Sequence, residues 1–495
     1  MAHTPTPEQA AIIAAATDTE DNLLVSALAG AAKTSTLELL ANALPKTQML
    51  CLAFNKLIAT EMAQRLPANC RVQTLNSLGL SIWKDTCRTR VSVDTGKMYR
   101  LLTAAIERSD PAEKNTIFDS FGMLLKEARS AKAAGHIPDS RMSKNPEQMK
   151  RNPNRLMSDK EMFDSMEEEP TALQEALLIG ILEESLDEGL AGKIDFDDML
   201  LLPTVYRATY PRVSLILVDE AQDLSPLNHV MLDKLARKRI IAVGDQCQAI
   251  YGFRGASSSG MADLKAQFDM TELPLTVSFR CPEAIVRHVQ GRAPTMQHWE
   301  GNPSPGAVIH KTHWSVHDIP DSAAVICRNN APLFTLAVSL LRHGRTPNLW
   351  GNDITKGLVK ILKKFGSTAM GQSAVLQCIS EWEDKKLKTA RNSSQVHDRA
   401  ECLRIFARQA DTLAGAMGYA ETLMDCTGPI QLMTGHKSKG HEFTHVYFLD
   451  AKLVGKDGQE PNLRYVICTR TMQELTYINT SGCEELQPEE EEDVA

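Results

Sequence analysis

A lysine followed by a hydroxyl residue stands directly after a short apolar segment near the amino terminus. The segment NLLVSAL (residues 22–28) leads into AGAAKTST, which contains Lys33 and Thr34. In a phosphate-binding loop of the pattern G-x-x-x-x-G-K-[ST], backbone N–H groups and the lysine hold phosphate, and the hydroxyl binds Mg²⁺. Ala27 and Ala32 stand at the two glycine positions of that pattern, and Gly30 remains between them. The stretch predicts a nucleotide site with an altered loop; an ordinary strand–helix turn is the alternative for the A-K-T triplet alone. The residues predicted to contact the nucleotide here are Ala29, Gly30, Ala31, Ala32, Lys33, Thr34 and Ser35.

Two carboxylates end a second apolar segment, SLILVDE (residues 214–220). A carboxylate at the end of a strand can hold Mg²⁺ through water, and the next one can polarise an attacking water molecule. Together with Lys33, the pair Asp219 and Glu220 predicts hydrolysis of a nucleoside triphosphate, with Thr34 and Asp219 as metal ligands. Solvent-exposed acids at a strand end are the alternative for two such residues alone, but the longer run DEAQD is more restrictive.

The elements that must position these residues are short apolar runs between helical stretches. Such runs favour buried parallel strands with crossover helices, an α/β architecture. They fall into two groups, before about residue 280 and after about residue 320, which predicts two cores. Residues 95–200 and 353–424 have no strand signal and are predicted to be helical insertions. The predicted strands are residues 22–28, 47–54, 214–220, 239–245, 323–328, 444–450 and 475–479.

Composition excludes several classes of protein. A chain of 495 residues with 43% hydrophobic side chains is long enough for two or more packed domains. No apolar run approaches the roughly 20 residues that span a bilayer, and the start lacks the order of a signal peptide. We therefore expect no membrane partner and a cytoplasmic protein, in a bacterium or a phage-infected host. Eleven cysteines without a C-x-x-C pair predict free thiols.

The net charge of −8 is concentrated at the carboxyl end. Seven acids lie between Glu484 and Asp493, so the rest of the chain is close to neutral. Basic stretches then stand out at residues 84–90, 144–155, 360–365 and 385–391. Each one alone is most often a solvated face, and a groove would be needed to make them a nucleic-acid surface.

From Asp219 to Asp223 the chain resembles the UvrD/Rep/PcrA-like superfamily 1 DNA helicases, and further stretches match the motifs of that family in order. The resemblance runs from residue 6 to about residue 480 and is greatest to compact members of the phage and F-box-helicase type, although no F-box is apparent. The matching stretches are TPEQ (6–9), LAFNKLIATEM (52–62), TLNSLG (74–79), IDFDDML (194–200), VGDQCQAIYGFRGA (243–256), VSFRCPEAI (277–285), LMTGHKSKGHEF (432–443) and LRYVICTRT (463–471).

The resemblance implies two RecA-like parallel-sheet motor domains with helical insertions. The first core, 1A, would comprise residues 1–92 and 191–280, interrupted by insertion 1B at 93–190. The second core, 2A, would comprise 281–352 and 425–482, interrupted by a reduced insertion 2B at 353–424. Residues 483–495 would form a disordered acidic tail.

It also implies roles around ATP and Mg²⁺. Gln9 would contact adenine, Phe279 would stack on it, and Gln248 would sense the γ-phosphate. Arg280 and Arg470 would act as arginine fingers. Glu442 completes the nucleotide-binding set, and the catalytic set is Lys33, Asp219, Glu220, Gln248, Arg280 and Arg470.

The implied track is single-stranded DNA. Phe54, Tyr251 and Phe253 would stack on bases, although core packing is the alternative for each ring taken singly. Arg254 would neutralise phosphate. The polar residues implied to hold the DNA backbone are Asn55, Thr74, Asn76, Ser77, Thr434, His436 and Lys439.

These features predict an ATP-dependent DNA helicase or translocase, with 3′ to 5′ polarity implied by the family alone. Its partners would be single-stranded and tailed duplex DNA and proteins of replication or recombination, with DNA repair as a further context. A nucleotide-gated protein that binds single strands or strips proteins from them with little unwinding is the alternative, because Ala32 alters the loop and 2B is small. Asn76, where relatives usually have histidine, is a further departure. A helicase–nuclease is disfavoured because no nuclease domain is apparent; RNA as the track has less support.

Overall fold

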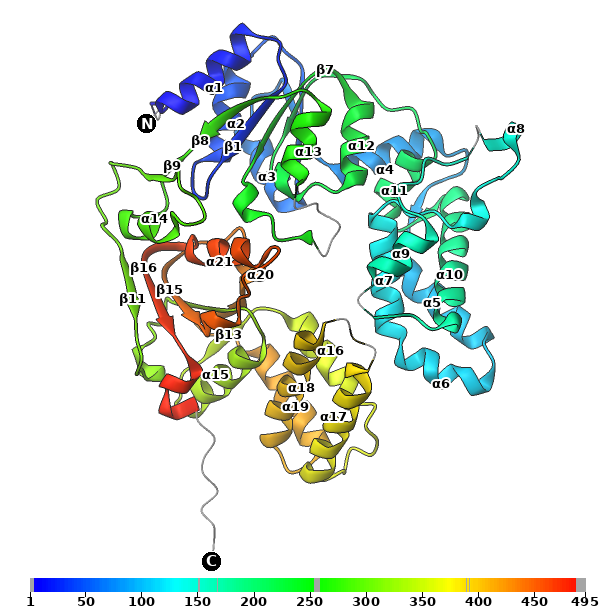
Figure 1. Ribbon diagram of the computed structural model, residues 1–495, viewed down its shortest axis with the longest axis vertical. Coiled ribbons are helices and arrows are strands. Elements are labelled where there is room, and N and C mark those ends of the chain that lie inside the picture. Colours follow the sequence, from blue (N-terminus) through cyan, green and yellow to red (C-terminus); the bar gives the residue numbers. More distant parts are fainter. Residues whose placement is uncertain are drawn as a thin grey trace, which may run out of the picture. The chain divides into compact units, whose positions relative to one another are not determined.

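The computed structural model describes residues 4–149, 152–166, 168–252, 259–388, 390 and 392–486, which form two compact units (Figure 1). The first unit comprises Met1–Ala27 and Ala32–Leu275. The second comprises Leu28–Ala31 and Thr276–Ala495. The finer division into 1A, 1B, 2A and 2B stays a prediction.

A six-stranded sheet forms the centre of the first unit. Its order is β3-β2-β6-β7-β1-β8, and all neighbouring strands are parallel. The carboxyl ends of all six strands therefore meet at one edge, where ligands bind in open α/β sheets. The strands are β1 Leu23–Ala27, β2 Met49–Ala53, β3 Cys70–Thr74, β6 Val213–Val218, β7 Ala236–Gly244 and β8 Thr271–Leu275. The covering helices are α1 Pro7–Asp18, α2 Lys33–Ala43, α3 Lys56–Arg65, α4 Leu75–Thr86, α11 Asp198–Val205, α12 Pro226–Leu235 and α13 Gly260–Gln267.

The four interior strands of this sheet are the four that the apolar runs predict. They are rich in Leu, Val and Ile because both of their faces are buried. The sequence missed β3 and β8, which lie at the two edges. Edge strands are partly solvated, and CRVQT and TELPL carry polar residues accordingly.

A lobe of helices interrupts this sheet in the chain and has a hydrophobic core of its own (Figure 1, cyan). The expected helical character is confirmed, except that Ser92–Val93 (β4) and Lys193–Ile194 (β5) pair as a short parallel ladder at its root. The prediction that residues 95–200 contain no strand was therefore wrong at β5. The helices are α5 Lys97–Arg108, α6 Pro111–Asp119, α7 Phe121–Ala133, α8 Pro146–Met149, α9 Asp159–Ser165 and α10 Ala172–Leu190.

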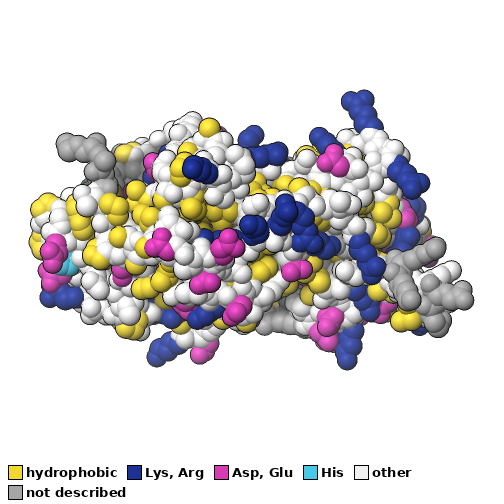
Figure 2. Space-filling model, turned by 90° about the horizontal axis from the view of Figure 1, so that it is seen from above, with side chains coloured by type: hydrophobic (Ala, Val, Ile, Leu, Met, Phe, Trp, Pro, Cys, Tyr) yellow, Lys and Arg dark blue, Asp and Glu magenta, His cyan; other side chains and the backbone are white. Residues whose placement is uncertain are grey.

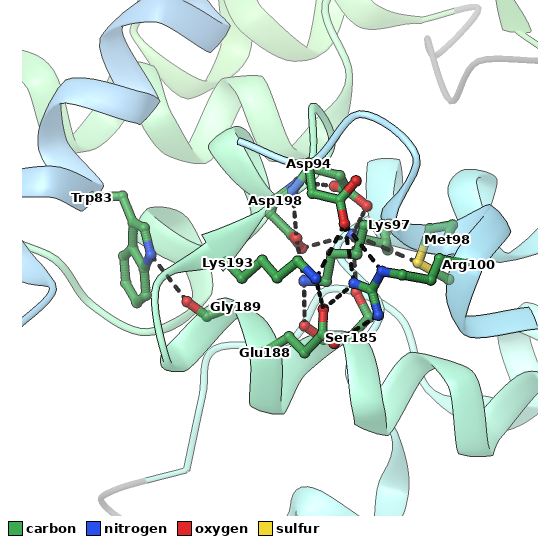
Figure 3. A network of polar contacts seen from close by, with 12 residues as sticks. Trp83, Asp94, Lys97, Met98, Arg100, Ser185, Glu188, Gly189, Lys193 and Asp198 are labelled. Atoms are coloured by element: carbon green, nitrogen blue, oxygen red, sulfur yellow. Dashed lines mark hydrogen bonds and ion pairs between the residues drawn. The ribbon is translucent and has the colours of Figure 1, made fainter. Parts of the chain in front are cut away.

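Buried ion pairs join this lobe to the core. Lys97 of α5 lies 2.8 Å from Asp198, and Lys132 of α7 lies 2.5 Å from Asp195 and 2.7 Å from Asp198. Figure 3 shows Lys97 and Asp198 pointing toward each other among the lobe's polar side chains. Removing one partner of such a buried pair leaves an uncompensated charge, so Asp195 and Asp198, two of the three aspartates of IDFDDML, fix the lobe to the core.

The second unit is built on another six-stranded parallel sheet, of order β11-β16-β15-β12-β14-β13. The predicted strands β12, β15 and β16 lie in its interior. Strands β11 and β13 are short edge strands that the sequence missed. It also missed the interior strand β14, in which Gln431 interrupts the apolar residues. The second group of strands was predicted to start after about residue 320. This was wrong, because β11 begins at Ala307. The strands are β11 Ala307–His310, β12 Ala324–Cys327, β13 Pro347–Leu349, β14 Ile430–Thr434, β15 Phe443–Leu449 and β16 Thr471–Ile478.

Eight α-helices and a short ladder accompany this sheet among the described residues of the second unit. The ladder pairs β9 Val277–Ser278 with β10 Gln297–His298. The helices described are α14 Glu283–Val289, α15 Ala331–Arg342, α16 Asn352–Leu362, α17 Gln372–Leu387, α18 Ser393–Arg408, α19 Leu413–Asp425, α20 Gly435–Ser438 and α21 Glu460–Cys468.

Helices α16 to α19 share one hydrophobic core with the sheet of the second unit. The rings of Phe334 in α15 and Phe406 in α18 meet edge to face, with centroids 5.0 Å apart. Asp398 of α18 accepts hydrogen bonds from the backbone N–H groups of Asn330 (3.1 Å) and Ala331 (3.0 Å) at the start of α15. A carboxylate at a helix amino end is stabilising, so these helices are firmly attached to their sheet.

Charged side chains of both signs lie on the surface of the protein. On the face shown in Figure 2, Lys and Arg side chains lie among Asp and Glu side chains. All eleven cysteines are free, as the sequence predicts. Among the described residues, no helix is both long and apolar enough to cross a membrane.

Candidate nucleotide and nucleic-acid site

The loop between β1 and α2 has the backbone of a phosphate-binding turn despite its missing glycines. Gly30 has φ +72° and Ala32, the residue before α2, has φ +58°, so both are left-handed. The backbone N–H of Thr36 donates to Ala32 O, 2.9 Å. The N–H groups of the three preceding helical residues, Lys33 to Ser35, therefore face the amino end of the helix, which favours an anion. Residues 28–31 group with the second unit, where Ala29 N–H donates to the Tyr465 hydroxyl at 2.9 Å.

Ala32→Gly is expected to stabilise the fold. A left-handed conformation costs a residue with a Cβ roughly 1–2 kcal/mol, and glycine removes this cost. Because glycine also has more conformational freedom in the unfolded chain, the net gain in the free energy of unfolding should be about 0.5–1 kcal/mol. Thermal unfolding measures the effect. Ala31→Gly, at a neighbouring buried alanine whose φ is not positive, is the control and should destabilise. Equal destabilisation by both substitutions would contradict the strain at Ala32.

Lys33 lies among the carboxylates at the carboxyl ends of β6 and β7. Its Nζ is 3.2 Å from Glu220 Oε1. Burial lowers the pKa of Lys33, but Glu220, Asp245 and Asp219 outweigh this and leave it raised, so the lysine is charged at neutral pH. Burial, reinforced by Glu220, raises the pKa of Asp219 to about 7. Three acidic side chains, Asp219, Glu220 and Asp245, thus surround the buried ammonium group of Lys33.

A chain of hydrogen bonds links Glu220 to Gln248. Glu220 has φ +51°, and its N–H donates to Asp219 Oδ1 at 3.0 Å. Gln222 Nε2 donates to Glu220, and Gln222 Oε1 accepts from the Asp245 N–H at 2.9 Å. Asp245 Oδ2 then accepts from Gln248 Nε2 at 2.6 Å. The first unit therefore brings Lys33, Asp219, Glu220 and Gln248 together, through two residues to which the sequence gave no role.

Gln9 and Ser35 are held by neighbouring side chains. Gln9 is buried; its Oε1 accepts from the Thr6 N–H and its Nε2 donates to Thr36 Oγ1, each at 3.0 Å. Ser35 Oγ accepts from Arg65 at 2.9 Å. Gln9 thus ties α1 to the first turn of α2, and its contact with adenine stays a prediction. Thr34 lies between Lys33 and Ser35 in that turn.

The nucleotide residues predicted in the second unit lie around one short segment. Arg280 Nε donates to Glu442 Oε2 at 2.5 Å. Arg470 is fully buried, and its guanidinium donates to the carbonyls of Val466 (2.9 Å) and His441 (3.2 Å). The two arginines therefore flank His441–Glu442, but the guanidinium group of Arg470 points into the interior of the second unit.

Phe279, predicted to stack on adenine, has an aromatic neighbour that the sequence did not identify. Its ring centroid lies 5.3 Å from that of Trp299, with the planes inclined at 46°. Trp299 is 20 residues further along the chain, in a loop after β10. Because 20 residues separate the two rings in the chain, the sequence carries no local signal for this pair.

Two of the predicted base-stacking rings form a pair. Phe54 follows β2 and Tyr251 follows β7, and their rings are parallel within 6° with centroids 5.9 Å apart. Phe54 is 37% exposed, so its ring is available to a ligand as well. Phe253 and Arg254 lie outside the described residues.

Polar residues predicted to hold the DNA backbone cap the helices beside this pair. Asn55 caps α3 by accepting from the Ile58 N–H at 2.9 Å, and Thr74 caps α4 by accepting from the Ser77 N–H at 3.2 Å. Asn76 Nδ2 donates to Phe196 O at 2.9 Å. Asn55 follows β2, Thr74 ends β3 and Asn76 comes two residues later, so all three lie at the carboxyl ends of these neighbouring strands.

Phe196 is an exposed aromatic residue in the stretch IDFDDML to which the sequence gave no role. Its side chain is 60% exposed although the flanking Asp195 and Asp198 are buried. It lines a hollow together with Arg129 of α7 and Asp197. An aromatic residue between aspartates, in a stretch that matched a family motif, was the signal that could have found it.

In the second unit, three further predicted DNA residues lie at the carboxyl end of β14. Thr434 ends the strand, His436 is in α20, and Lys439 follows that helix. Burial, with Arg328 nearby, lowers the pKa of His436 to about 4, so the imidazole is neutral at physiological pH. It can therefore serve as a hydrogen-bonding group and not as a cation there.

Comparison with known proteins identifies the family. The profile of the UvrD/REP helicase N-terminal domain matches residues 6–269, more than half of the chain. The chain belongs to the UvrD/Rep helicase family. Its resemblance to that family is thereby confirmed, and the two parallel sheets agree with two RecA-like domains.

Individual relatives support this membership in the UvrD/Rep family. F-box DNA helicase protein 1 of Schizosaccharomyces pombe is 22% identical over 96% of this chain and 57% of its own length. The ATP-dependent DNA helicase Rep of Escherichia coli is 34% identical over 15% of this chain and 13% of its own, and that of Salmonella typhimurium is 34% identical over 19% and 16%. The chain thus spans less than two thirds of the length of these relatives.

Proposed function

We propose that this UvrD/Rep-family protein is an ATP-driven motor that moves 3′ to 5′ along single-stranded DNA and separates duplex. The observation that carries the proposal is the network in which Lys33 contacts Glu220, and Glu220 connects through Gln222 and Asp245 to Gln248. A lysine, a strand-end carboxylate and a polar sensor at one sheet edge are the parts that phosphoryl transfer requires. The family membership and the names of the relatives support DNA as the track.

The residues present fit ATP with Mg²⁺. The amino end of α2 and Lys33 are suited to the β- and γ-phosphates, and the oxygen donors Thr34 and Asp219 are of the type that Mg²⁺ prefers. The ion, held there, would neutralise phosphate charge. Glu220 would accept a proton from the attacking water, and Gln248 would contact the γ-phosphate. Arg280 is proposed as the arginine that stabilises charge on the transferred group, and Arg470, whose guanidinium is buried against the carbonyls of Val466 and His441, would have to turn outward to join it.

The parallel rings of Phe54 and Tyr251 form the centre of the proposed DNA surface. Stacking on aromatic rings holds bases regardless of sequence, as a motor needs. The helix caps at Asn55 and Thr74 supply polar groups for phosphates beside the rings. Phe196, exposed next to Asn76, extends the same surface.

Phe54→Ala is expected to weaken binding of single-stranded DNA. Base–aromatic stacking contributes about 1–3 kcal/mol per base, so the dissociation constant should rise by roughly tenfold or more. Fluorescence anisotropy with a labelled oligonucleotide measures this. Phe118→Ala is the matched control, because Phe118 is 55% exposed on α6 but lies outside the proposed surface. Equal affinities of the two variants for single-stranded DNA would show that Phe54 does not contact the DNA.

Unwinding of tailed duplexes tests the proposed function as a whole. The full chain with ATP should separate a duplex that carries a 3′ single-stranded tail and leave a 5′-tailed duplex intact. Displacement of streptavidin from a biotinylated single strand without any unwinding would instead establish the protein-stripping alternative. Unwinding from the 5′ tail would contradict the proposed polarity.

A further inference from the structure

Trp299 and Phe279 form an aromatic corner at the carboxyl end of the β9–β10 ladder of the second unit. The parallel register of this ladder ends with His298 beside Ser278, so Trp299 and Phe279 are the next residues on the two strands. The Trp299 N–H donates to Ser278 O at 3.0 Å and continues the pairing. The two ring centroids lie 5.3 Å apart, with the planes inclined at 46°. Both side chains are half-buried, so part of their ring surface is open to a ligand.

The loop that follows Trp299 holds the indole in this place. Gly301 lies against the ring, since a Cβ there would be 2.6 Å from Cη2 and 2.7 Å from Cε2 of the indole. The Trp299 carbonyl accepts from the Asn302 N–H at 2.9 Å, and Asn302 Oδ1 accepts from the Ser304 N–H at 3.1 Å. Gly306 ends the loop with φ +67°, a conformation that favours glycine. An indole fixed in this way loses little conformational entropy when a ligand binds to it.

The aromatic corner is joined to the phosphate-binding loop within the second unit. The Phe279 N–H donates to Gly30 O at 2.9 Å, and residues 28–31 belong to this unit. Gly30 approaches the segment closely, because a Cβ there would lie 2.6 Å from both Arg280 Cβ and Ser278 Oγ. Phe279 is therefore in backbone contact with the loop, and the base of a nucleotide bound there is within reach of the two rings.

We propose that Trp299 is a specificity-determining residue that holds the base of the nucleoside triphosphate together with Phe279. This inference rests on the proposed ATP-driven function and deepens it, because it assigns the site a preference for purines over pyrimidines. The fused rings of a purine are large enough to contact both walls of the corner, whereas the single ring of a pyrimidine covers one. Aromatic rings hold bases by their π-faces, so the corner selects by ring size and not by hydrogen bonds.

Substitutions at Trp299 separate an aromatic wall from general packing. Trp299→Ala removes the ring, Trp299→Leu keeps apolar bulk without a ring, and Trp299→Phe keeps a smaller ring. Trp382→Ala is the matched control, because Trp382 is another half-buried tryptophan of the second unit and packs from α17 against its core. Circular dichroism and thermal unfolding establish that each variant is folded.

The main readouts are the dissociation constants of a non-hydrolysable ATP analogue, the matching CTP analogue and inorganic triphosphate, which has no base. Trp299→Ala and Trp299→Leu should bind the ATP analogue roughly tenfold more weakly, the usual cost of removing one base-stacking ring, and Trp299→Phe should lose less. The affinity for the CTP analogue should change less, so the purine preference falls, and the affinity for inorganic triphosphate should not change. In ATP hydrolysis the loss should appear in KM with kcat close to wild type, because the base is bound equally in the ground state and the transition state.

A double variant distinguishes contact with the base from support of Phe279. If Trp299 contacts the base, the losses in ATP-analogue affinity of Trp299→Ala and Phe279→Ala should combine, and the double variant should be weaker than either single one. If Trp299 acted only by holding Phe279, the double variant would bind the analogue as Phe279→Ala does.

The outcomes keep failure of the corner apart from failure of the motor. A folded Trp299→Ala variant with wild-type affinity for the ATP analogue would overturn the role of Trp299 and leave the motor intact. So would equal weakening of the ATP analogue and inorganic triphosphate, or a double variant no weaker than Phe279→Ala. Absence of DNA-stimulated hydrolysis in the wild-type protein would refute the proposed motor, while the analogue affinities would still decide whether Trp299 holds the base.

Discussion

Lys33→Ala should lose at least about 10²–10³-fold in the rate of ATP hydrolysis, the usual cost of removing one preorganised charge-stabilising group. The lysine lies at the amino end of α2, where the helix and its own charge both favour phosphate. Its raised pKa keeps it charged throughout the neutral range. Substitution also leaves Glu220, Asp219 and Asp245 without their buried cation, so binding of the anionic nucleotide should weaken as well.

Phosphate release with saturating DNA measures this loss. Lys46→Ala removes an exposed lysine three residues after α2 and should leave the rate unchanged. Hydrolysis by Lys33→Ala within tenfold of the wild-type rate would show that the altered loop is not the nucleotide site.

Arg280→Ala should reduce kcat by about 10³-fold or more, the effect of removing an arginine that stabilises transition-state charge in phosphoryl transfer. Arg280 is held by Glu442 at 2.5 Å, and its side chain is 20% exposed, so the guanidinium is both oriented and accessible. Arg280→Lys should restore little activity, because an ammonium cannot reproduce the planar, two-pronged donor geometry.

Steady-state kinetics with varied ATP separate this role from simple binding. The loss should appear in kcat more than in KM. Arg287→Ala, at an arginine whose side chain is 66% exposed on α14, provides the control. If Arg280→Ala instead raised KM alone, Arg280 would be a binding residue and the finger would have to be sought elsewhere.

The sequence predicted the fold class because interior parallel strands are continuous apolar runs. It missed the edge strands β3, β8, β11 and β13 because they are short, partly solvated and polar, and it missed the interior strand β14, whose apolar residues are interrupted by Gln431. The contacts that join the insertions to their cores, Lys97–Asp198 and Asp398–Ala331, could not be predicted, because they lie between residues far apart in the chain.

Of the candidate site, the sequence predicted the residues with recognisable motifs but not their connections. Lys33, Glu220 and Gln248 meet in one network, yet the bond from Gln222 to Asp245 joins residues 23 apart on neighbouring strands and has no local signal. The left-handed backbone at Ala32 has no signal in the sequence, because alanine stands there in place of glycine. The burial of Arg470 could not be inferred, because charged residues are rarely fully buried and its partners are backbone carbonyls.

ATP hydrolysis, measured with and without single-stranded DNA and with single-stranded RNA as the comparator, decides whether this protein is a DNA-dependent motor. We expect slow hydrolysis without nucleic acid, strong stimulation by DNA, weaker stimulation by RNA and no stimulation in Lys33→Ala. A wild-type rate that equals the Lys33→Ala rate in the presence of DNA would contradict the claim that this protein is a DNA-dependent motor.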